Sequence, residues 1–190
     1  MRRTLKELVV APLAFAALVG CASSGGLPRN DTKIDRVQIQ GTESSYDIRL
    51  TTDAYETKAS LDFSADSVWR VVPTAYAAMS IPTEGTDPAH RLFVGNVTAH
   101  RRFNSQPLSK YVDCGSSLTG PNADAYDVLM RVQTQVDSVA AGQSLLRTRI
   151  EAAGSRAGGT AVRCISTGEL ERQLSIRVKL LVLNQPAPAQ

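Results

Sequence analysis

Histidine and cysteine are scarce in this 190-residue chain, which contains two of the first and three of the second. His90 and His100 stand ten residues apart, and no pair of His or Cys residues has the short spacing typical of zinc sites. The sequence also lacks a GxSxG elbow, a P-loop and a GxGxxG turn. We therefore predict that the chain is not an enzyme and that it has no catalytic residues, no metal site and no cofactor.

The chain also lacks a strong excess of charge, because 21 Lys and Arg residues face 18 Asp and Glu residues. Most of the net charge of +3 lies in residues 1–20, so the rest of the chain is nearly neutral. Proteins that bind nucleic acids carry a clustered basic face. Arg101-Arg102 is the only adjacent basic pair outside the N-terminus, and we predict no nucleic-acid partner.

The apolar stretch near the N-terminus, residues 8–20, is too short to cross a membrane. Its 13 residues reach about 20 Å as a helix, whereas a bilayer core is roughly 30 Å thick. A short basic segment precedes the stretch, which predicts a cleaved signal peptide over residues 1–20. The alternative is a buried N-terminal helix, but Pro12 and the lack of a polar face argue against it.

The end of this stretch, Leu18-Val19-Gly20-Cys21, resembles the lipobox of bacterial lipoproteins. The resemblance implies cleavage after Gly20, a diacylglycerol on the Cys21 sulfur and acylation of the new N-terminus. It also implies localisation to the outer membrane, facing the periplasm, because Ala22 rather than Asp follows the cysteine. Two or more acyl chains make a stable anchor. The membrane is therefore one predicted partner, through Cys21, and an envelope protein is the other.

The rest of the chain divides into three parts. Residues 21–45 are polar and rich in turn-forming residues, which predicts a flexible tether behind the lipidated Cys21. Within it, Val37-Gln38-Ile39 is either a short edge strand or no regular structure. Residues 46–183 are predicted to form a single α+β domain, and residues 184–190 a disordered Pro/Ala tail.

Alternation of apolar and polar residues predicts most of the strands. The pattern covers residues 46–50, 55–63, 93–103, 126–136 and 146–152. Residues 140–143 read as the loop of a hairpin between the last two strands, and residues 52–54 as a turn between the first two. The outward residues are polar, which favours an antiparallel sheet with one side in water.

A helical stripe follows the second strand. Its apolar residues recur at spacings of three and four: Val68, Trp69, Val72, Tyr76 and Met79. Ser64 is positioned to cap this helix, and Pro73 lies inside it and is predicted to kink it. The stripe is either part of the core, which we favour, or the lining of an apolar ligand site.

The last segment, residues 168–183, fits both a helix and a strand. The capping-box pattern Ser166-x-x-Glu169 and the abundance of helix-forming residues favour a helix. The fold class is then α+β, an antiparallel sheet of about four to six strands with two main helices packed on one face. This order of elements resembles the helix-grip domains of small periplasmic lipoproteins, including BamC-like (NlpB) proteins, and no functional residue is carried over from them.

Two cysteines remain once Cys21 is lipidated. An even pair in an exported chain predicts a disulfide between Cys114 and Cys164. The bridge would attach residues 107–113 to the start of the last helix and stabilise the fold by about 4 kcal/mol. The alternative is that Cys114 acts as a nucleophile with His90 or His100 as its base.

These observations predict a non-enzymatic lipoprotein of the bacterial cell envelope whose domain contacts another envelope protein. The alternative function is a binding module that holds an apolar small ligand between the sheet and the helices.

Overall fold

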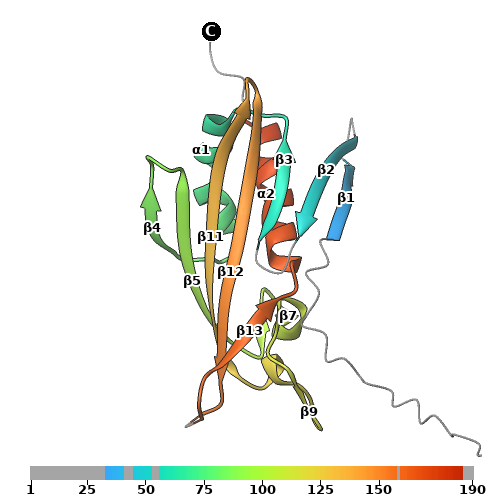
Figure 1. The fold of residues 1–190 in the computed structure, drawn as a ribbon, viewed down its shortest axis with the longest axis vertical. Coiled ribbons are helices and arrows are strands. Elements are labelled where there is room, and N and C mark those ends of the chain that lie inside the picture. Colours follow the sequence, from blue (N-terminus) through green and yellow to red (C-terminus); the bar gives the residue numbers. More distant parts are fainter. Residues whose placement is uncertain (1–32, 41–44, 53–55, 158, 186–190) are drawn as a thin grey trace, which may run out of the picture.

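The computed structural model describes residues 33–40, 45–52, 56–157 and 159–185. Cys21, the predicted signal peptide and residues 186–190 of the predicted tail lie outside these ranges. The elements are β1 Lys33–Gln40, β2 Ser45–Thr52, β3 Thr57–Leu61, α1 Ala65–Ala78, β4 Thr83–Asp87, β5 Leu92–His100, β6 Arg102–Phe103, β7 Gln106–Pro107, η1 Leu108–Lys110, β8 Val112–Asp113, β9 Ser116–Ser117, β10 Gly120–Pro121, η2 Asn122–Asp124, β11 Asp127–Ala140, β12 Gln143–Ser155, β13 Val162–Ser166 and α2 Glu169–Leu183 (Figure 1).

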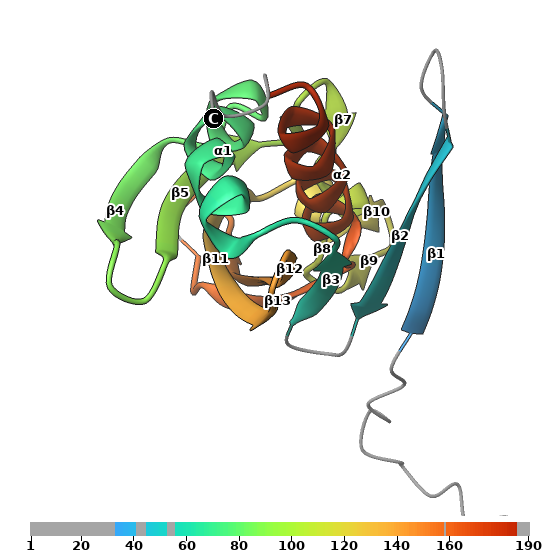
Figure 2. The same cartoon turned by 90° about the horizontal axis from the view of Figure 1, so that it is seen from above.

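The main sheet is antiparallel and has the order β1-β2-β3-β12-β11-β5-β4; in addition, β13 pairs with β12, and β8 pairs with β13. Both long helices lie next to each other on its concave face (Figure 2). The predicted α+β class is therefore confirmed, with both helices on one side of an antiparallel sheet. The sheet is larger than the four to six strands expected, because β4 and β13 add strands that the alternation did not identify and β1 adds an edge strand. Neither of the described long helices is of the length and apolarity that a membrane crossing needs.

The hairpin of β11 and β12 is the longest part of the sheet, with 14 and 13 residues. Ala141 and Gly142 form its turn, and Gly142 has a φ of 71°, a left-handed conformation that glycine adopts without strain. Inward residues such as Val128, Met130 and Val132 are fully buried. The predicted hairpin is confirmed.

This hairpin is much longer than the helices that cover it. A strand of 14 residues spans roughly 45 Å, whereas the 14 residues of α1 span about 21 Å. The helices therefore cover only the upper half of the inner face, towards the hairpin turn (Figure 1). The segment 101–126 and β13 occupy the lower half.

Helix α1 begins where the sequence predicts, because the Ser64 Oγ accepts a hydrogen bond from the Ser67 N–H at 3.2 Å. The helix continues through Pro73 to Ala78. The Tyr76 hydroxyl donates to the Thr134 Oγ1 of β11 at 2.9 Å.

The predicted stripe lies against the sheet. Val68, Val72 and Tyr76 have no exposed surface and Met79 is buried, while Trp69 is half-buried and packs on Phe93 with ring centroids 4.1 Å apart. The stripe is therefore part of the hydrophobic core.

Helix α2 confirms that the last segment is helical, but its expected capping box is wrong. The residue at the N-cap position is Gly168, in a left-handed conformation with φ 82°. Ser166 still belongs to β13, and its Oγ accepts from the Gly168 N–H at 3.1 Å and donates to the Glu171 carboxylate at 2.6 Å. The left-handed turn moves Ser166 away from the first helical N–H groups.

The predicted tether is wrong over Lys33–Gln40. All eight of these residues pair with β2, so they form an edge strand of the sheet. The short alternation at residues 37–39 marked this strand, but it was too brief to show its extent, which depends on the pairing with β2.

The lower half is closed by the predicted disulfide, which is confirmed between Cys114 and Cys164. Beside it, β8 pairs with β13, and the Thr167 N–H donates to the Tyr111 carbonyl at 2.9 Å. The segment 107–113 is therefore attached to the start of α2, as expected. A Cβ placed on Gly154 would stand 3.2 and 3.3 Å from the two sulfur atoms, so β12 passes close behind the bridge.

Gly95 provides a test of how tightly the upper half is packed. A Cβ there would stand 2.7 Å from the Pro82 carbonyl oxygen and 2.9 Å from the Tyr76 Cε1. We expect Gly95→Ala to lower the free energy of unfolding by about 2 kcal/mol through overpacking, measured by urea denaturation. Gly85→Ala is the matched control, because nothing lies within 4 Å of its Cβ. Equal urea midpoints for the two variants would contradict this packing.

Candidate functional site

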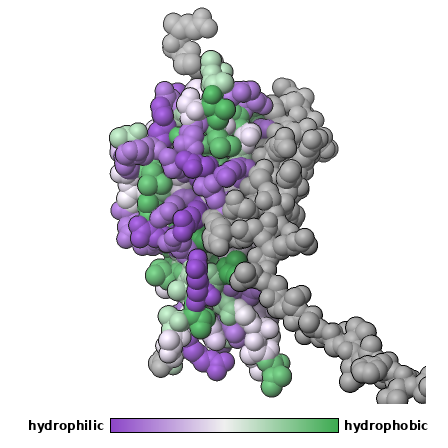
Figure 3. All heavy atoms as spheres, viewed as in Figure 1, coloured by the Kyte–Doolittle hydropathy of each residue, from purple (hydrophilic) through white to green (hydrophobic). Residues whose placement is uncertain are grey.

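The face of the sheet opposite the helices carries the outward residues of β11 and β12. Charged and polar residues dominate the upper half of this outer face, and hydrophobic residues gather among them towards the lower end (Figure 3). In the upper half, the Arg147 Nε lies 2.6 Å from a carboxylate oxygen of Asp137, and the Lys58 Nζ lies 3.2 Å from the Glu56 carboxylate. These charges are paired, so the upper half offers few free groups to a ligand.

The lower half of the outer face has a shallow hollow of about 420 Å³, lined by Leu129, Arg131, Glu151, Ala152, Ala153 and Arg163. The strand register explains it. Ala153 of β12 is opposite Leu129 of β11 on one side and Arg163 of β13 on the other. Because the middle residue is small, the larger side chains on either side leave a depression between them.

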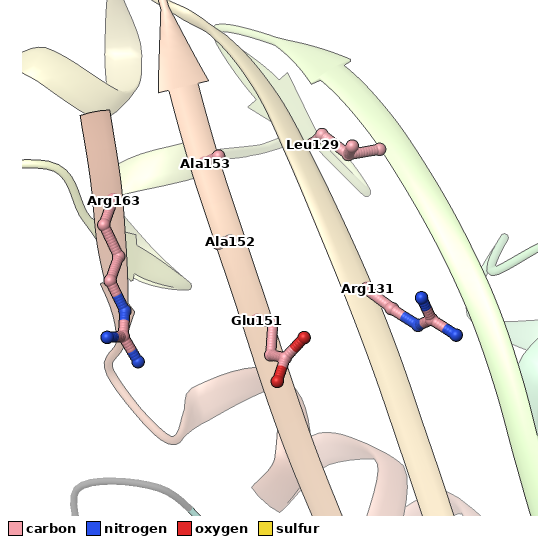
Figure 4. A pocket seen from close by; sticks show the side chains of 6 residues that line it. All are labelled: Leu129, Arg131, Glu151, Ala152, Ala153 and Arg163. Atoms are coloured by element: carbon pink, nitrogen blue, oxygen red, sulfur yellow. The ribbon is translucent and has the colours of Figure 1, made fainter. Parts of the chain in front are cut away.

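The hollow has an excess of positive charge. Arg163 and Arg131 lie on opposite sides of Glu151 (Figure 4). The Glu151 carboxylate accepts a hydrogen bond from the Arg149 guanidinium at 2.6 Å. Within the described part of the chain, neither Arg131 nor Arg163 has a hydrogen-bond or ion-pair partner. Two guanidinium groups are thus free to bind an anionic group.

Two large apolar side chains extend this surface. Leu129 is 48 % exposed and Ile165 is 58 % exposed. Ile165 follows Arg163 by two residues in β13, so both point to the same face of the strand. We call this surface the arginine patch and define it by Leu129, Arg131, Ala153, Arg163 and Ile165. Exposed apolar residues combined with arginine are typical of protein interfaces.

The residues predicted for other roles are placed elsewhere. Cys21 lies outside the described residues. The disulfide leaves Cys114 without a thiol, so the alternative of a Cys114 nucleophile is wrong. His90 and His100 are exposed and lie beside carboxylates, with Nδ1 2.7 Å from Asp87 and 2.9 Å from Asp127. Among the described residues, no cluster of His, Cys, Asp and Glu is arranged to hold a metal ion.

The arginine patch could not be identified from the sequence. Alternation in β11 and β12 showed which of their residues point outwards. It did not show that β13 pairs with β12 and brings Arg163 and Ile165 beside them, because β13 is only five residues long and has no alternating signal of its own.

Comparisons with protein-family models, curated proteins and solved structures find no match for this chain. The resemblance to BamC-like lipoproteins stays a prediction. The function has to be inferred from the residues and their geometry.

The start of α2 contains the most perturbed carboxyl group. Glu171 is only 3 % exposed, and its Oε1 accepts the hydrogen bond from Ser166. Its Oε2 is buried without a hydrogen-bond partner among the described residues. Burial raises the pKa of the Glu171 carboxyl to about 7, and the nearby charge of Glu169 adds to the effect.

We expect this carboxyl to destabilise the fold as pH rises. The folded state holds the proton more tightly than the unfolded state, so the favourable contribution is complete below about pH 4.5 and is lost as pH rises to about 7. Relative to Glu171→Gln, the free energy of unfolding of the natural chain should fall by about 3 kcal/mol over this range. Urea denaturation at several pH values measures the difference.

Glu169 gives a control of opposite sign. The Arg172 guanidinium holds the pKa of the Glu169 carboxyl below its usual range. Its favourable contribution is therefore present above the unfolded pKa and is lost as pH falls. A difference between the natural chain and Glu171→Gln that does not change with pH would contradict the buried, protonated state of Glu171.

Proposed function

We propose that the chain is a non-enzymatic lipoprotein of the bacterial cell envelope, anchored through Cys21 to the outer membrane with its domain facing the periplasm. The observation that carries this proposal is the lipobox-like Leu18–Cys21 at the end of a basic and apolar leader. The disulfide supports it, because such bonds persist in exported proteins and are rare in the cytosol. It pairs two of the three cysteines in the sequence, and Cys21 is the third.

Replacement of Cys21 tests the anchor. In cells fed with labelled palmitate, the natural chain should incorporate the label and fractionate with the outer membrane. Cys21→Ser should carry no label and leave the membrane fraction, because it lacks the sulfur that receives the lipid. Ala22→Asp should keep the label and move to the inner membrane. If Cys21→Ser remains fully in the membrane fraction, the anchor is not at this residue.

The arginine patch supports a role in binding another envelope protein. Its two free guanidinium groups flank an exposed apolar surface, and such a combination complements a segment that carries both acidic and apolar side chains. Arginine is also frequent among the residues that dominate binding energy at interfaces. We therefore propose that the partner presents an acidic segment with apolar residues to this patch.

The alternative of an apolar ligand between the sheet and the helices is less well supported. It depends on the stripe of α1 being available to a ligand. Val68, Val72 and Tyr76 have no exposed surface and pack directly into the core. No observation on the described residues favours this function over protein binding.

Site-specific crosslinking tests the arginine patch. A photoreactive residue at Ile165 should form one reproducible adduct in the envelope. Each of Arg131→Glu and Arg163→Glu should weaken the binding of the purified partner roughly tenfold, because a charge-assisted hydrogen bond is lost and replaced by repulsion. Arg177→Glu is the matched control, because this exposed arginine lies on α2, behind the sheet. Equal affinities for all three variants would rule out the patch as the binding site.

A further inference from the structure

The lower end of the domain is formed by two loops that contain no acidic residue (Figure 1). One is the β9–β10 hairpin, residues 116–121 with the sequence SSLTGP. The other connects β12 to β13 and is described over residues 155–157 and 159–162. Arg156 carries the only formal charge in the two loops, although charged residues make up 21 % of the chain. Its side chain has no hydrogen-bond or ion-pair partner among the described residues.

These loops expose apolar side chains. Leu118 stands at the tip of the hairpin and is fully exposed, and Val162 is 38 % exposed. Among the described residues of the upper end, the only exposed large apolar residue is Val139, which lies beside the turn of the long hairpin. Leu118 is thus a protruding apolar tip rather than part of a groove.

The disulfide joins the base of the hairpin to β13, the strand that follows the second loop. Cys114 precedes the hairpin by two residues, and Cys164 follows Val162 by two residues. The hairpin base is further fixed by the Asn122 N–H, which donates to the Gly115 carbonyl at 2.9 Å. The apolar tip is therefore presented by a hairpin whose base is fixed by a covalent bond and a hydrogen bond, so its binding would cost little ordering of the chain.

We infer that this lower end contacts the anionic lipid surface of the membrane that carries the anchor, an inference that rests on the proposed anchoring at Cys21. A bilayer accepts a protruding leucine between its headgroups without a preformed pocket. Anionic headgroups attract an unpaired arginine, whereas acidic residues, which these loops lack, would be repelled.

The length of the N-terminal segment is compatible with this orientation. Strand β1 starts at Lys33, on its lower side, and the register through β2 and β3 places Lys33 level with Thr148 of β12. The strand β12 continues from there to Ser155, about 23 Å further down. Lys33 follows Cys21 by twelve positions, which can span up to about 40 Å, so the anchor can reach the lower end.

Because the lipid anchor already holds the protein on the membrane, a weak contact between the lower end and the lipid surface is enough to orient the domain. A tethered domain meets the membrane at an effective concentration on the order of millimolar. A surface with one inserted leucine and one arginine therefore does not need high intrinsic affinity to stay in contact. The lipid chain holds the protein on the membrane, and the lower end determines which face of the domain is turned towards it.

Vesicle flotation with the unlipidated mature chain, Cys21→Ser, tests the lower end without the anchor. We expect binding to vesicles of phosphatidylglycerol and phosphatidylcholine at lipid concentrations up to about 5 mM, and much weaker binding to phosphatidylcholine alone. Leu118→Ser should lower the partition coefficient about tenfold, and Arg156→Glu at least about fivefold. Val139→Ser and Arg177→Glu are the matched controls, because both sites are exposed and lie away from the lower end, and both should bind as the parent does.

Two outcomes would overturn the inference. One is no binding to anionic vesicles over this range of lipid. The other is an equal partition coefficient for Leu118→Ser and Val139→Ser, which would show that the tip is not the contact and would leave it open to a protein partner. The two proposals are tested by different assays. The proposed anchoring fails if the natural chain carries no palmitate label in cells, whereas the flotation assay uses a chain without lipid and tests only the lower end.

Discussion

The length of the β11–β12 hairpin is the constraint on which the rest of the fold depends. Its strands are roughly twice as long as the helices, so about half of its apolar inner face extends beyond them. Apolar strand residues in that half have to be buried. The segment 101–126 supplies the cover, with buried residues that include Leu108, Tyr111 and Val112, and the Cys114–Cys164 disulfide joins this cover to β13.

This solution gives the domain two different halves. The upper half is a sheet covered by helices, and its core is tightly packed, as the close approach of Gly95 to Pro82 shows. The lower half is built from short elements that depend on a covalent bond. Both proposed contact surfaces, the arginine patch and the two acid-free loops, lie in this lower half.

Elements with a repeated local pattern could be predicted from the sequence. Alternation over many residues identified β11 and β12, and spacings of three and four with Ser64 as the cap identified α1. Elements that depend on a distant neighbour could not be predicted. Strand β4 has the sequence TEGTD, with no apolar alternation, and exists because it pairs with β5. The N-cap residue of α2 is Gly168 rather than Ser166, because β13 continues to Ser166.

The sequence by itself determined the α+β class, the long hairpin and the pairing of Cys114 with Cys164. Each of these depends on residues that are close in the chain or on a simple count of cysteines. The tertiary structure alone decided that Arg163 and Ile165 lie beside Leu129 and Arg131. It also decided that Leu118 stands free at one end. The physical reason is that alternation shows which side of a strand faces water, whereas strand order determines which outward side chains become neighbours.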